Sequence, residues 1–226
     1  MSSQEWDALL DSIPLTKAIR ESDLLSDDMN EEMLADDFYD RDISDNDIDE
    51  QNEDMLRRQK IFRIAARFVA DEFRKFAWVT QIAIIGSVAK PLCKEVPRFR
   101  DYRRRGIELW HECSDLDLAV WVTEPTMLND LRKARTAALK SMYEKHPNIM
   151  GVAHHQVEVF VIDASTDTYL GRLCTFGQCP KQDKRECKMP DCGKPLFLKR
   201  MEGFRFYPDA LIGAVPLYLQ SNNRNE

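Results

Sequence analysis

No run of apolar residues in this sequence approaches the roughly 18 residues that a membrane-spanning helix needs, so neither a membrane span nor a membrane partner is expected. The chain begins Met-Ser-Ser-Gln-Glu-Trp and lacks the basic start and apolar core of a secretory signal, so we expect a cytoplasmic location. No internal repeat is present. What remains, 226 residues of which 43% are hydrophobic, suffices for one well-cored domain with accessory segments.

Acidic residues gather near the N-terminus. Residues 21–54 carry sixteen Asp or Glu against one basic residue, Arg41, for a charge of −15, and residues 1–20 add −1. Because the whole chain carries −7, residues 55–226 carry +9. We predict that residues 1–54 form an acidic, largely disordered leader with a short amphipathic segment. The basic body favours a polyanionic partner, and the leader is a candidate for contacting that body within the same chain.

Hydrophobic periodicity predicts an α/β sheet protein beyond this leader. Apolar residues recur at three- and four-residue steps over residues 55–77 and 126–145, which predicts two helices. Short apolar, partly β-branched runs at 82–85, 116–122 and 155–162 predict three strands. Strands that alternate with helices and long connections are typical of an α/β sheet.

Two aspartates stand at the start of the second predicted strand. The side chains of Asp115 and Asp117 project to the same face, because strand residues two apart share a face. Two carboxylates that close repel each other unless a cation holds them. Mg²⁺ suits this role, since it takes a few carboxylate oxygens and keeps other positions for water and phosphates. The alternative interpretation is a solvated turn, where acidic residues are common.

Two further features stand at strand positions. Glu158 is the one charged residue of the apolar run 157–162, so it either lies on an exposed face or faces something positive. Gly86 and Ser87 end the first predicted strand, where a glycine lets the backbone approach a ligand and a following helix could present N–H groups to a phosphate. A Gly-Ser pair is also an ordinary turn.

These features occur in the order IIGSVAK, SDLDLAVWV and QVEVFVI. Over residues 55–163 this arrangement resembles the polymerase-beta-type nucleotidyltransferase superfamily, especially its minimal, single-domain members. The resemblance implies a nucleotidyltransferase fold, with a small mixed β-sheet flanked by helices, for residues 55–170. Residues 92–112 lengthen the connection beyond that of minimal members, so we interpret them as an insertion, and residues 201–226 as a C-terminal extension packing on the core.

The resemblance also implies a chemistry. Asp115, Asp117 and Glu158 would be the catalytic carboxylates and bind two Mg²⁺ (or Mn²⁺) ions, while Gly86 and Ser87 would hold the triphosphate. Lys90 is a candidate phosphate contact. The implied reaction moves a nucleoside monophosphate from a nucleoside triphosphate to an acceptor hydroxyl on RNA, a protein or a small molecule, with release of pyrophosphate. The alternative is a catalytically idle module of the same fold that binds nucleic acid or a partner protein in a toxin–antitoxin or regulatory role.

Four of the six cysteines fall within nineteen residues: Cys174, Cys179, Cys187 and Cys192. Four thiolates suit a tetrahedral, structural Zn²⁺ ion. A chain without a secretion signal favours such a metal site over disulfides, with free thiols as the alternative. We therefore predict a zinc-ribbon-like segment over residues 171–200, a small zinc-knuckle appendage to the fold.

Basic residues gather in two places. The predicted insertion holds five arginines within eight residues: Arg98, Arg100, Arg103, Arg104 and Arg105. Further lysines and arginines surround the cysteines. Both sets are candidates for binding RNA, since arginine suits phosphate recognition. Either set could equally be a solvated surface.

Overall fold

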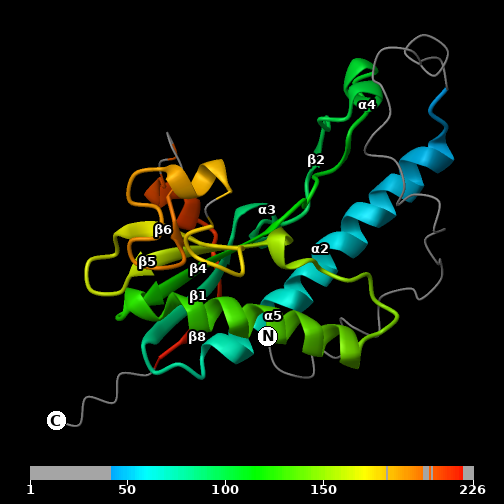
Figure 1. Ribbon diagram of the computed structural model, residues 1–226. Helices are drawn as coiled ribbons and strands as arrows, with labels where there is room; N and C mark the ends of the chain where they lie inside the picture. The colour runs from blue at the N-terminus through cyan, green and yellow to red at the C-terminus, as the bar shows by residue number, and fades with distance from the viewer. Residues whose placement is uncertain (1–41, 182, 201–203, 205, 221–226) are drawn as a thin grey trace.

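The computed structural model describes residues 42–181, 183–200, 204 and 206–220 (Figure 1). Residues 1–41, which hold most of the predicted leader, lie outside the described residues, as do parts of the predicted C-terminal extension. Within the described residues the protein is a mixed α/β structure built on a six-stranded sheet, in the order β7-β6-β5-β4-β1-β8. The predicted α/β class is therefore confirmed.

The sheet is mixed, because β4 and β5 run parallel while the other paired strands run antiparallel. The three strands predicted from sequence are its central ones. Their bounds and those of the outer strands are β1 Val79–Ile85, β4 Leu116–Val122, β5 Val157–Asp163, β6 Tyr169–Leu173, β7 Leu198–Lys199 and β8 Val215–Leu219. No strong sequence signal marks β6, β7 or β8, which are short and only partly buried.

Two long helices, α2 (Asp45–Phe73) and α5 (Leu128–Lys145), pack on one face of the sheet and bury the main hydrophobic core against it (Figure 1). A one-turn helix, α3 (Gly86–Ala89), follows β1 directly. None of the helices among the described residues is both long and apolar enough to cross a membrane.

The start of α2 corrects a prediction. The sequence placed a helix over residues 55–77 and assigned 45–54 to the leader, whereas the helix begins at Asp45 and ends at Phe73. Ser44 caps it, since the Ser44 hydroxyl accepts a hydrogen bond from the Asp47 N–H and the Asp47 carboxylate accepts one from the Ser44 N–H. Asn52 also accepts a bond from the Trp110 N–H at 2.8 Å. The Ser44 cap and the contact with Trp110 thus stabilise a helix where the composition predicted disorder.

The predicted insertion forms an arm, residues 92–112. Strands β2 (Lys94–Glu95) and β3 (Leu109–Trp110) pair antiparallel at its base, and the short helix α4 (Arg100–Arg104) forms its tip. Figure 1 shows the arm leaving the sheet beside the N-terminal half of α2. The Arg105 guanidinium donates to the Ile43 carbonyl at 3.5 Å, so the arm's tip lies next to the point where the described chain begins.

The second face of the sheet is covered by residues 204 and 206–214, here called the C-terminal segment. Phe204, Phe206, Leu211 and Ala214 pack on the buried residues of this face, which come from β1, β4 and β5: Ala83, Ile85, Ala119, Trp121, Phe160 and Ile162. Strand β8 then returns to pair with β1. The C-terminal segment therefore lies over the face on which the candidate site is built.

Candidate functional site

The register of the sheet brings the predicted site residues together. Asp117 lies opposite Ile85, the last residue of β1, and beside Glu158 on the parallel strand β5. Gly86 and Ser87 follow Ile85 at once, so they start at the same end of the sheet. Alternation along β4 places Asp117 on the face that the C-terminal segment covers.

Gly86 and Asp117 are in close contact. Gly86 has a φ of +72°, a conformation that favours glycine. A Cβ atom added there would lie 2.4 Å from the Asp117 Oδ2 atom. The glycine is thus required twice, once for its backbone conformation and once because the carboxylate occupies the space of a side chain.

Asp117 is the carboxylate most perturbed by its surroundings. Burial raises its pKa from 3.8 to about 7, with further raising by Glu158 and Asp115 and partial lowering by Arg172. Asp115 differs, since it is exposed and accepts a hydrogen bond from the Ser114 hydroxyl at 3.4 Å. The site therefore contains a negative charge that the protein balances poorly.

Glu158 faces a positive charge, one of the two situations expected from sequence. An Arg172 Nη1 atom forms an ion pair with its Oε2 atom. The Arg172 guanidinium also lies 4.7 Å from the centroids of the Phe160 and Phe204 rings. Arg172 lies on β6, opposite Phe160, so only strand pairing brings it to Glu158. In the sequence, Arg172 belongs to the basic residues around the cysteines, and nothing local links it to Glu158.

The turn after β1 is held from behind by side chains of α2. Arg63 donates to the Val88 carbonyl at 3.1 Å and to the Lys90 carbonyl at 3.3 Å, and Gln59 donates to the Lys90 carbonyl at 3.0 Å. The Lys90 side chain itself is exposed and stays available to a ligand. These contacts fix the backbone of the turn.

A buried histidine completes this support. His111 accepts a hydrogen bond at Nδ1 from the Cys93 N–H, 3.3 Å away, so its Nε2–H is free to donate to the Ser87 carbonyl at 3.1 Å. The Ser87 hydroxyl bonds to the thiol of Cys113, whose pKa burial raises. Sequence gave His111 no role, since one histidine in a loop carries no signal.

A pocket of about 340 Å³ opens beside Asp117, while Asp115 and Glu158 are not among its lining residues. Its residues come from β1, the following turn, β4, β5 and the C-terminal segment: Ile85, Gly86, Lys90, Asp117, Phe160, Phe204, Phe206, Tyr207, Asp209, Ala210 and Ile212. Sequence reasoning missed every member from the C-terminal segment. The pocket brings phosphate-binding candidates and aromatic side chains into one cavity.

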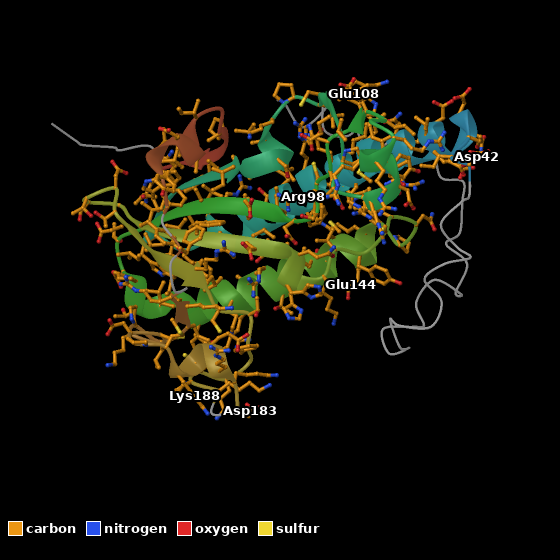
Figure 2. All side chains as sticks on the ribbon, turned by 90° about the horizontal axis from the view of Figure 1, so that it is seen from above. Asp42, Arg98, Glu108, Glu144, Asp183 and Lys188 are labelled. Atoms are coloured by element: carbon orange, nitrogen blue, oxygen red, sulfur yellow. The ribbon has the colours of Figure 1, made fainter. Side chains whose placement is uncertain are left out.

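The four clustered cysteines lie on the excursion between β6 and β7, at the edge of the molecule where Figure 2 labels Asp183 and Lys188. Burial raises the pKa of the Cys174 thiol, and the other three thiols raise it further, so the four lie near one another. The N–H of Phe176 donates to the Cys174 sulfur at 3.4 Å, and that of Phe197 to the Cys179 sulfur at 3.2 Å.

The described residues do not form a ready metal site at either place. Across residues 42–181, 183–200, 204 and 206–220, no group of three or more His, Cys, Asp or Glu side chains is arranged so that it could hold a metal ion. At the carboxylates, the Arg172 ion pair occupies one oxygen of Glu158.

No family model, curated protein or solved structure matches this chain.

Proposed function

We propose that this protein is a nucleotidyltransferase of the polymerase-beta type, which uses Mg²⁺ to move a nucleoside monophosphate from a nucleoside triphosphate to an acceptor hydroxyl. The observation that carries this proposal is the position of Asp117, between Gly86 on one side and Glu158 on the other. A side-chain-free turn beside paired carboxylates is the arrangement that binding of a metal-complexed triphosphate needs.

The residues present fit a hard divalent cation. Asp117 is half-buried, its pKa is raised to about 7, and its carboxylate neighbours add negative charge that a cation would relieve. Asp117 with Asp115 would hold the ion, and Glu158 would join them on leaving Arg172. When bound, Mg²⁺ would supply charge stabilisation at the reacting phosphate and lower the pKa of the attacking hydroxyl.

The chain's own groups would position the triphosphate and take up the proton of the acceptor hydroxyl. Gly86 lets the triphosphate approach the backbone, and Lys90 offers a charge to it. The acceptor oxygen would bond to the α-phosphorus while the bond from that phosphorus to the bridging oxygen of the β-phosphate breaks. The hydroxyl proton would pass to the Asp117–Glu158 carboxylate pair, and pyrophosphate would leave with the electrons of the broken bond.

Incubation of the protein with each α-labelled nucleoside triphosphate, Mg²⁺ and cell extract tests the proposal. Label should appear in an RNA, protein or small-molecule fraction, and Asp117→Asn should abolish it. Lys140→Gln, an exposed change on α5, should leave it intact. Absence of label from every fraction at all four nucleotides would contradict the enzyme proposal.

One observation favours a second candidate, a catalytically idle module of the same fold. The ion pair between Arg172 and Glu158 neutralises a carboxylate that catalysis would use, as expected of a fold that no longer binds metal. Calorimetry separates the two: an idle module would bind neither Mg²⁺ nor a magnesium–nucleotide complex, whereas the enzyme would bind both and lose them on Asp117→Asn.

The RNA partner stays a proposal that rests on the arm. Arg98, Arg103 and Arg104 are exposed at its tip, and charge of this density suits a phosphate backbone. Changing these three to glutamine should weaken binding of a structured RNA and flatten its salt dependence. The matched control changes three exposed lysines of α5: Lys133, Lys140 and Lys145.

A further inference from the structure

The pocket beside Asp117 has two chemically different ends. One end holds Gly86, Lys90 and Asp117, which suit a phosphate and its metal. The other end is aromatic, with Phe160 from β5 and Phe204, Phe206 and Tyr207 from the C-terminal segment. The aromatic end is not needed to hold a triphosphate, so we expect it to bind a different group of the ligand.

The aromatic wall is rigid, because other side chains hold it from behind. The Phe206 ring stacks on Tyr169 with centroids 5.0 Å apart and planes 17° apart. The Arg172 guanidinium packs against both Phe160 and Phe204, each at 4.7 Å. These contacts fix the rings of Phe160, Phe204 and Phe206 before any ligand arrives, so binding would cost little ordering of these three side chains.

Apolar side chains at the rim remain open to solvent. Tyr207 is 64% exposed and Ile212 is 76% exposed, although both line the pocket. Exposed apolar groups that border a concave site mark a surface that a ligand covers. Asp209, also on the lining, offers an acceptor to a sugar hydroxyl.

We infer that this aromatic end is the subsite for the base of a purine nucleotide, with the base stacked against Phe206 and Tyr207 while the phosphates lie at Gly86 and Lys90. This inference rests on the proposed function, which it deepens by assigning the base subsite. The volume of about 340 Å³ lies within the range of small-molecule sites. A purine is favoured over a pyrimidine because its larger ring system covers more of the wall.

Calorimetry with α,β-methylene nucleotide analogues, which cannot transfer their nucleotidyl group, tests the subsite on the full chain. We expect the wild type to bind the ATP or GTP analogue about tenfold more tightly than inorganic triphosphate with Mg²⁺, the effect of about one stacking contact. The purine analogues should also bind more tightly than those of UTP and CTP.

Three variants locate the effect. Tyr207→Ala and Phe206→Leu should each lose most of the advantage of the nucleotide over triphosphate, while affinity for triphosphate stays the same. Tyr207→Ala removes an exposed side chain, so the fold should tolerate it, and Phe206→Leu keeps an apolar side chain against Tyr169. The control is Tyr143→Ala, which removes a similarly exposed tyrosine, 58% exposed, from α5.

The possible failures are distinguishable. If triphosphate and the nucleotides bind wild type equally, or if Tyr207→Ala and Phe206→Leu keep the full difference, the base subsite is wrong while the metal-triphosphate site stands. A preference for pyrimidines would likewise overturn the assignment. If neither triphosphate nor any nucleotide binds with Mg²⁺, the proposed function itself fails, and the subsite with it.

Discussion

A side chain at position 86 would collide with Asp117, since a Cβ on Gly86 would lie 2.4 Å from the Asp117 carboxylate oxygen. This contact joins the turn that would hold phosphate to the carboxylate that would hold metal. A substitution that moves the turn at Gly86 is therefore expected to move the Asp117 carboxylate as well.

Substitution of Gly86 by alanine tests this contact. Two costs are expected: about 1–2 kcal/mol for a positive φ in a non-glycine residue, and displacement of the Asp117 carboxylate. Nucleotidyl transfer and nucleotide binding should both be lost. The matched control is Gly106→Ala, because Gly106 also has a positive φ, +64°, but open space where its Cβ would lie. Equal effects in thermal unfolding and in binding would contradict the contact.

Removal of Arg172 should expose how strongly it compensates Glu158. Arg172→Gln leaves a partly buried carboxylate unpaired, so we expect a loss of about 1–3 kcal/mol in the free energy of unfolding. Adding Glu158→Gln should recover part of that loss in a double-mutant cycle measured by urea unfolding. The exposed pair of Lys140 and Glu144 serves as a control, with expected changes within about 0.5 kcal/mol. Additive effects at Arg172 and Glu158 would argue against coupling.

The raised pKa of Asp117 predicts a pH dependence in metal-free buffer. A folded-state pKa of about 7, above the unfolded value of 3.8, gives stability that is fully present below about pH 4 and lost as the pH rises through about 7. Asparagine cannot ionise. Asp117→Asn should therefore be more stable than wild type above about pH 7, by up to about 4 kcal/mol, and the difference should vanish toward about pH 4.

Asp163 provides a control of opposite sign. Hydrogen bonds from Ser165 and Thr166 lower its pKa, so its contribution is present at neutral pH and lost as the pH falls. Asp163→Asn should be less stable than wild type at neutral pH. Thermal unfolding between about pH 2 and about pH 8 measures both variants, since the contribution of Asp163 is lost only below about pH 4. Parallel curves for Asp117→Asn and wild type would contradict the shift.

The cysteine segment should carry about one zinc ion per chain, since four thiols lie near one another and backbone N–H groups point at two of the sulfurs. Cys179→Ser with Cys192→Ser should remove the zinc and lower the melting temperature. Loss of zinc should also destabilise the sheet at β5, because Arg135 donates to the carbonyls of Val157 and Cys174 and so links the cysteine segment to that strand. Metal analysis measures the outcome, with the exposed Cys93→Ser as control. If the double variant lacks zinc but melts at the same temperature as wild type, the prediction is wrong.

The acidic leader should compete with RNA for the arm. Residues 1–41 carry twelve acidic and three basic residues, and the chain enters the described structure beside Arg105. Deletion of residues 1–41 should strengthen RNA binding at moderate salt in a filter assay. The cut should not extend to residue 54, because that would remove the Ser44 cap and the Asn52 contact of α2. Unchanged binding would exclude masking by the leader.

The sequence was enough for the central elements of the fold. Hydrophobic runs are local signals, and they located β1, β4, β5 and α5 to within a few residues. Alternation along the strands predicted that Asp117 shares a face with Asp115 and that Glu158 shares a face with Phe160. The helix start at Asp45 was missed, because the contact between Asn52 and Trp110 that supports this part of α2 joins segments far apart in sequence.

The amino-acid sequence by itself determined which residues could do chemistry: a glycine after a buried strand, two alternating aspartates and a lone glutamate in an apolar strand. Tertiary structure decided what surrounds them. Strand pairing brought Arg172 to Glu158, and folding of the arm brought His111 to Ser87. The aromatic wall arises in the same way, because the C-terminal segment crosses a face built from other strands. Such neighbours depend on register and on long-range packing, which local patterns do not encode.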